Sequence, residues 1–115
     1  MTKILLLNGP NLNLLGSREK DIYGDSTLEE IEDRLSARAS ENNLNLLCFQ
    51  SNAEHELVDK IQEAKKSNVK IILFNPGAFT HTSVALRDAI LGVNIPMIEI
   101  HICLLYTSPS PRDQS

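Results

Sequence analysis

Residues 69–77 read Val-Lys-Ile-Ile-Leu-Phe-Asn-Pro-Gly, a nearly continuous apolar run that ends abruptly in turn residues. Such a short β-branched run is typical of a parallel strand covered by helices on both faces, because that strand needs no polar face. Asn75, Pro76 and Gly77 supply the turn that leaves the strand. This stretch therefore predicts a strand of an α/β domain.

Short β-prone runs alternate with helical periodicity along the rest of the chain. We expect strands at about 4–7, 44–50, 69–74 and 97–101, and helices at about 28–41, 54–67 and 82–91. Ser26 or Thr27 is expected to cap the first helix. The alternating order predicts right-handed crossovers and a parallel sheet, with ligands bound beyond the carboxyl ends of its strands. Polar residues follow all four strands, so a single rim is expected to collect them.

The composition limits the classes of function. At 115 residues with 42% hydrophobic residues, the chain suits one domain with a buried core. Its net charge of −4 argues against a general nucleic-acid binder. The two cysteines have no disulfide or metal-site pattern, and Cys48 is expected to be a buried thiol. No apolar stretch approaches the ~20 residues that a membrane span needs, so we expect a cytoplasmic protein without membrane or nucleic-acid partners.

The composition changes abruptly at residue 103. The segment that follows, CLLYTSPSPRD, has no helical or strand period, and its prolines block both structures. One interpretation is a disordered Pro/Ser-rich terminus, and the other is a foreign segment that resembles a translated sequencing adapter. We therefore expect a domain at residues 1–102 and a non-native, disordered tail at 103–115.

Four motifs in order carry a family resemblance. They are ILLLNGPNLNLLG at 4–16, QSNAE at 50–54, NPGAFTHTS at 75–83 and EIHI at 99–102. Together they resemble the type II 3-dehydroquinate dehydratases over residues 3–102. The resemblance implies a flavodoxin-like three-layer α/β fold, here without its last strand and helix. It also implies that a homododecamer eliminates water from 3-dehydroquinate to give 3-dehydroshikimate through an enolate, without metal or organic cofactor.

The resemblance also implies the groups that move protons. Tyr23 is the expected base, and Arg18 is the cation that favours its phenolate, because a free phenol with a pKa near 10 is a poor base at pH 7. His101 is the expected general acid for the departing hydroxyl, and Glu99 fixes its tautomer from the same strand face. Without the resemblance, Tyr23 reads as an ordinary tyrosine beside a turn, Arg18 as a surface charge and His101 as structural.

The remaining site residues are expected to hold the substrate. The resemblance implies that Asn11 holds a water at the enolate oxygen, and that Asn75 and His81 hold substrate oxygen groups. It places Asp88 against the neighbouring subunit's site, and a backbone amide at Ile102 near the substrate carboxylate. The plainer interpretations are turn chemistry for the asparagines, a helix cap for His81 and an exposed helix acid for Asp88.

Two other functions remain open from the sequence. One is a flavodoxin- or receiver-like module that binds a small ligand, although no GxGxxG or P-loop motif occurs. The other is a non-catalytic remnant. Because the family continues with a serine where Cys103 stands, and then with a further strand and helix, we expect this polypeptide itself to be impaired in folding or activity.

Overall fold

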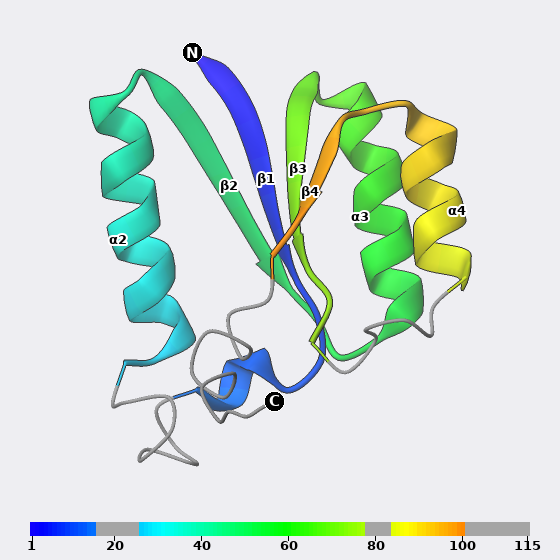
Figure 1. The fold of residues 1–115 in the computed structure, drawn as a ribbon, viewed down its shortest axis with the longest axis horizontal. Coiled ribbons are helices and arrows are strands. Elements are labelled where there is room, and N and C mark those ends of the chain that lie inside the picture. Colours follow the sequence, from blue (N-terminus) through cyan, green and yellow to red (C-terminus); the bar gives the residue numbers. More distant parts are fainter. Residues whose placement is uncertain (16–25, 78–83, 101–115) are drawn as a thin grey trace, which may run out of the picture.

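The computed structural model describes residues 1–15, 26–77 and 84–100, which form a parallel sheet flanked by helices (Figure 1). The elements run in the order β1 (Thr2–Asn8), the 3-10 turn η1 (Leu12–Leu14), α2 (Leu28–Glu41), β2 (Leu44–Gln50), α3 (Glu54–Lys66), β3 (Val69–Asn75), α4 (Val84–Val93) and β4 (Met97–Glu99). The expected alternation of strands and helices is therefore confirmed.

The sheet has the order β2-β1-β3-β4, and every neighbouring pair is parallel. This order is the beginning of the flavodoxin-like arrangement, in which the chain reverses direction across the sheet beside its first strand. Helix α2 covers one face, while α3 and α4 cover the other (Figure 1). The expected α/β class with a flavodoxin-like sheet is confirmed.

The main core lies between the sheet and the pair α3 and α4. Leu5 and Leu7 of β1 alternate toward this face, as do Ile72 and Phe74 of β3. The helices contribute several fully or nearly buried side chains to the same cluster: Leu57, Ile61, Ala64, Leu86, Ile90 and Val93. This packing fixes the positions of the strands and of the loops that leave their ends.

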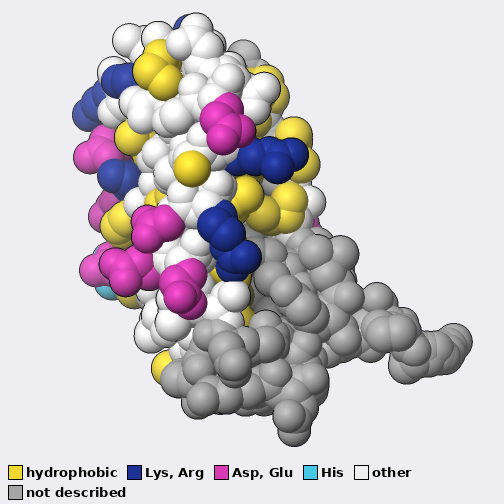
Figure 2. Space-filling view, turned by 90° about the vertical axis from the view of Figure 1, so that its left-hand side faces the viewer, with side chains coloured by type: hydrophobic (Ala, Val, Ile, Leu, Met, Phe, Trp, Pro, Cys, Tyr) yellow, Lys and Arg dark blue, Asp and Glu magenta, His cyan; other side chains and the backbone are white. Residues whose placement is uncertain are grey.

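The α2 face is covered less completely. Within α2 only Leu28 is buried, and it packs with Leu12 and Leu15 of the first loop. Acidic side chains run along this side of the molecule, and hydrophobic side chains gather beside them (Figure 2). Cys48 of β2 is half-buried here, so the expectation of a buried thiol holds only in part.

The start of α2 confirms the expected cap. The Thr27 hydroxyl accepts a hydrogen bond from the backbone N–H of Glu30 at 3.1 Å, and the Glu30 carboxylate accepts from the Thr27 N–H at 2.8 Å. This reciprocal arrangement satisfies two backbone donors at the helix start. Across residues 1–15, 26–77 and 84–100, no helix is long and apolar enough to span a membrane.

Candidate functional site at the carboxyl ends of the strands

Three polar residues end neighbouring strands at one level. Asn8 of β1 pairs in register with Gln50 of β2 on one side and with Asn75 of β3 on the other. Asn8 and Asn75 are almost completely buried, whereas Gln50 is partly exposed. The rim that the sequence predicted therefore exists at the carboxyl edge of the sheet, at the lower edge in Figure 1.

Two glycines let the loops that leave β1 and β3 touch. A Cβ atom on Gly9 would lie 2.2 Å from the carbonyl oxygen of Pro76, a distance that no real side chain tolerates. Gly77 has a φ of +58°, and a Cβ there would lie 2.6 Å from the carbonyl oxygen of Pro10. The Gly9 N–H donates to the Asn75 carbonyl at 2.8 Å, which locks the two loops together.

Amide side chains from β2 and its loop hold the first loop in place. The Gln50 amide nitrogen donates to the Gly9 carbonyl and to the Asn52 Oδ1, at 3.1 Å in each case. The same Asn52 oxygen accepts the backbone N–H of Asn11 at 3.0 Å. Asn11 is thereby held in a left-handed conformation with φ of 69°. Its exposed side chain has no hydrogen bond within the described parts of the chain, so it is free to bind a ligand or water.

Asn75 presents an amide whose nitrogen has no hydrogen-bond partner among the described residues. The residue is only 2% exposed. A buried donor without a partner is uncommon in folded proteins and often marks a binding position. The structure therefore brings Asn11 and Asn75, two of the expected site residues, to the same rim.

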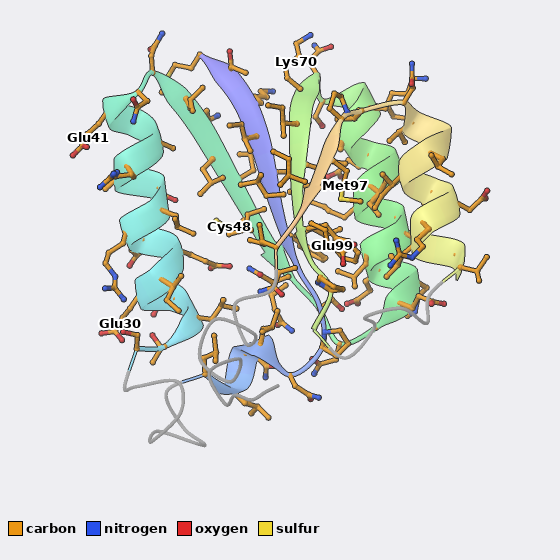
Figure 3. The ribbon with its side chains drawn as sticks, viewed as in Figure 1. Glu30, Glu41, Cys48, Lys70, Met97 and Glu99 are labelled. Atoms are coloured by element: carbon orange, nitrogen blue, oxygen red, sulfur yellow. The ribbon has the colours of Figure 1, made fainter. Side chains whose placement is uncertain are left out.

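Glu99 ends β4 beside this rim (Figure 3). Its carboxylate lies 3.7 Å from the Arg87 guanidinium of α4. Glu99 is in register with Phe74, so both point toward α3 and α4, and Asn75 points to the opposite face. Glu99 and Asn75 thus approach the same edge of the sheet from its two faces.

Of the other expected site residues, only Asp88 lies in the described part of the chain. Asp88 is exposed on α4, where its expected role at a neighbouring subunit stays a prediction. The rest lie outside the described residues, and their roles also stay predictions: Arg18, Tyr23, His81, His101 and Ile102.

Burial and negative charge shift two acid groups on the α2 face. Burial raises the pKa of the Cys48 thiol to about 11, and the nearby Glu32 carboxylate adds to the effect. Burial also raises the pKa of Glu32 itself, against the lowering effect of its hydrogen bond with Asn8. Within the described ranges, no three His, Cys, Asp or Glu side chains gather as a metal-ligand set.

A surface pocket lies elsewhere, between α4 and the amino-terminal end of β4. Its lining has no charged side chain: Ile90, Leu91, Asn94, Ile95, Pro96 and Met97. Sites for small polar molecules combine a cleft with a few convergent polar groups. The rim supplies such groups and this pocket supplies few, so we regard the rim as the candidate site.

Comparison with known proteins decides the family. A family model described as dehydroquinase class II matches residues 2–115. This chain belongs to the class II dehydroquinases. The 3-dehydroquinate dehydratase of Proteus mirabilis is 62% identical over 112 residues, which span 97% of this chain and 76% of the relative. The corresponding protein of Hahella chejuensis is 56% identical over 115 residues, or 78% of its own length.

Solved structures of class II dehydroquinases share the fold. The type II dehydroquinase of Butyrivibrio crossotus is 46% identical with a TM-score of 0.81, over 85% of this chain and 68% of that one. That of Propionibacterium acnes is 35% identical with the same TM-score, over 88% and 69% of the two chains. The family match includes residues 103–115, and the interpretation of that segment as foreign stays a prediction.

The sequence alone gave no role to several residues that build this class II dehydroquinase rim. Gln50 and Asn52 were visible only as part of a motif, and Asn8 only as a strand-end amide. Glu32 carries one usable signal, because it follows Leu28 by four residues and so lies on the inner side of the α2 helix. Its contact with Asn8 depends on how α2 packs on the sheet, which no sequence period specifies.

Proposed function

We propose that this chain removes water from 3-dehydroquinate to give 3-dehydroshikimate, the reaction named for its relatives. The observation that carries the proposal is the rim itself. In a member of the class II dehydroquinases, the Asn11 side chain and the Asn75 amide nitrogen both lack a hydrogen-bond partner among the described residues. Asn11 lies in the loop after β1, and Asn75 ends the adjacent strand β3. Fixed polar groups of this kind suit a substrate rich in oxygen atoms.

Proton removal is the first step of the proposed mechanism. The Tyr23 phenolate, favoured by the Arg18 guanidinium, takes a proton from the carbon next to the ketone. The electron pair of the broken C–H bond forms a carbon–carbon double bond, and the π pair of the C=O bond moves to the ketone oxygen, which gives an enolate. A water molecule held by Asn11 donates a hydrogen bond to that oxygen, where the negative charge develops.

Loss of the hydroxyl group completes the elimination. The ketone C=O re-forms, the electron pair of the enolate C=C bond shifts to make the new carbon–carbon double bond, and the C–O bond breaks. The His101 imidazolium protonates the departing oxygen, so that it leaves as water. Glu99 keeps the imidazole in the required orientation and charge state. Tyr23 then releases its proton to solvent and His101 takes one up, which restores the phenolate and the imidazolium.

Substrate binding completes the proposal. Asn75 and His81 hold substrate oxygen groups, and the backbone amide at Ile102 holds the carboxylate. Asp88 reaches the site of a neighbouring subunit in a homododecamer, and no cofactor takes part. A cytoplasmic location fits the free Cys48 thiol, since reduced thiols persist in that compartment.

A histidine pair tests the proposed acid. The variants are made in a chimera in which the carboxyl-terminal part of the Proteus mirabilis relative replaces residues 103–115. His101→Asn is expected to lower kcat by at least about a hundredfold, the usual contribution of a general acid. The matched control is His55→Asn, because the exposed His55 lies in the first turn of α3 and none of the proposed steps uses it. Turnover is followed by the ultraviolet absorbance of the conjugated product.

A tyrosine variant in the same chimera tests the base. Tyr23→Phe removes only the hydroxyl group and is expected to lower kcat as strongly as His101→Asn. Unchanged kcat in either variant, with the His55→Asn control also unchanged, removes the assigned roles.

A further inference from the structure

Two buried atoms at the rim complement each other. Oδ1 of Asn8 accepts hydrogen bonds and Nδ2 of Asn75 donates them, yet neither has a partner among the described residues. The two residues are 0% and 2% exposed, and they are register partners on β1 and β3. Their side chains therefore point to the same face from adjacent strands. An unmatched acceptor beside an unmatched donor fits a group that can donate and accept at once.

Glu32 determines whether the oxygen or the nitrogen of the Asn8 amide faces Asn75. The Asn8 Nδ2 donates to the Glu32 Oε2 at 3.2 Å. An ionised carboxylate can only accept, so it selects the nitrogen and turns the amide oxygen away. Helix α2 packs over β2, whereas Asn75 ends β3 on the other side of β1. The oxygen of Asn8 is thereby directed toward the Asn75 side.

We propose that Glu32 is a positioning residue that acts through Asn8, so that Asn8 Oδ1 and Asn75 Nδ2 together hold one hydroxyl group. That group donates to the Asn8 oxygen and accepts from the Asn75 nitrogen. It is a water molecule in the free protein or a hydroxyl of the substrate in the complex. The inference rests on the proposed function, because Asn75 is one of the residues proposed to hold substrate oxygen groups.

The surroundings of Glu32 argue against a purely stabilising role. Burial raises its pKa, and the carboxylates of Asp33 and Glu29 on the same helix raise it further, with the Cys48 thiol facing it from β2. A carboxyl group whose pKa is raised on folding stabilises the fold only while protonated, and this contribution is lost as the pH rises through the folded-state pKa. Replacing Glu32 by neutral Gln is therefore not expected to weaken the fold at pH 8.

The test uses the chimera described above, labelled with ¹⁵N, in which the side-chain amide resonances of Asn8 and Asn75 are assigned. The amide group that Glu32→Gln introduces can both donate and accept hydrogen bonds, so it no longer selects one orientation of the Asn8 amide. It is expected to shift both resonances. Glu41→Gln removes the same charge from the exposed far end of α2 (Figure 3) and is expected to shift neither. In the unmodified chain both resonances are expected to shift with pH as the Glu32 carboxyl group titrates. This pH dependence is expected to disappear in Glu32→Gln.

Added 3-dehydroquinate distinguishes water from a substrate hydroxyl. If a substrate hydroxyl bridges Asn8 and Asn75, Glu32→Gln should weaken substrate binding. The 3-dehydroquinate concentration that half-saturates the shift of the Asn75 resonance should then rise about fivefold, the change expected for one neutral hydrogen bond. If water alone supplies it, this concentration is unchanged while the substrate-free shifts remain.

Two outcomes overturn the inference. One is an Asn75 resonance that is identical in Glu32→Gln and Glu41→Gln and does not respond to the titration of Glu32. The other is a Glu32→Gln chain that unfolds at pH 8, since Glu32 would then be a structural residue. Failure of the proposed function is recognised separately, because 3-dehydroquinate would then leave the Asn75 resonance of the unmodified chain unmoved.

Discussion

At the scale of single residues, hydrogen-bonding capacity explains more of the rim than charge does. Asn8, Gln50 and Asn75 all end strands with an amide, a group that donates and accepts without the desolvation cost of a buried charge. The sequence predicted that Asn11 and Asn75 would meet at this edge, because the carboxyl ends of parallel strands share one rim. It did not predict the unmatched amide atoms, since these depend on side-chain orientation rather than on spacing.

Cys48 provides a prediction at this scale. Burial and the Glu32 carboxylate hold the pKa of its thiol at about 11, above the usual 9.0. In a Cys103→Ser chain, where Cys48 is the remaining cysteine, alkylation at pH 8 should be about a hundredfold slower than in the urea-unfolded chain, because the thiolate is the reactive form. The rate should still rise between pH 9 and 11. A rate that levels off near pH 9 would show that the thiol is unshifted.

The same shift has a consequence for stability. A thiol whose pKa is raised on folding favours the folded state while it is protonated, so its contribution is complete below pH 9 and is lost as the pH approaches 11. The unfolding free energy of the Cys103→Ser chain should accordingly fall over this interval by more than that of a chain that also carries Cys48→Ala.

At the scale of elements, the strands and helices follow from periodicity, but the loop contacts do not. The expected strand at 44–50 and the helix at 28–41 agree with β2 and α2, because each has a clear apolar pattern and end signals. β1 extends further at both ends than the expected 4–7, since pairing with two neighbours recruits Thr2, Lys3 and Asn8. The contact of the Gly9 and Gly77 loops joins distant parts of the chain, so no local pattern reports it.

The glycine contact gives the prediction at this scale. Gly9→Ala would force a methyl group against the Pro76 carbonyl and should lower the unfolding free energy by about 2–3 kcal/mol, as overpacking does. Gly92→Ala is the matched control, because its Cβ would meet nothing within 4 Å. In α4 it should raise the unfolding free energy by about 0.5–1 kcal/mol. Urea unfolding checks both values.

Equal effects of the two alanine substitutions would contradict the close approach of the loops. A Gly9→Ala chain that stays as stable as the unmodified one would mean that the β1 and β3 loops can separate freely. The rim would then not hold Asn11 and Asn75 at a fixed distance, and its use as a preorganised site would fail.

At the scale of the whole molecule, the two faces of the sheet differ. The α3 and α4 face has a continuous core, whereas the α2 face is less completely covered, and Ile98 of the edge strand β4 is 53% exposed. Within the described residues β4 is the last strand of the sheet, and an apolar side chain on an edge strand favours association with other chains. Family membership could be predicted from the sequence because four motifs recur in order. Subunit assembly could not, because it depends on surfaces that this one chain does not bring together.

We propose that the strand-end rim of this chain dehydrates 3-dehydroquinate. The most direct test is to incubate 3-dehydroquinate with the chimera that carries the carboxyl-terminal part of the Proteus mirabilis relative, and to identify the product by NMR. We expect 3-dehydroshikimate, formed with a kcat within about tenfold of that of the relative itself, a difference of about 1.4 kcal/mol in barrier. A folded, soluble chimera that leaves 3-dehydroquinate unchanged would contradict it.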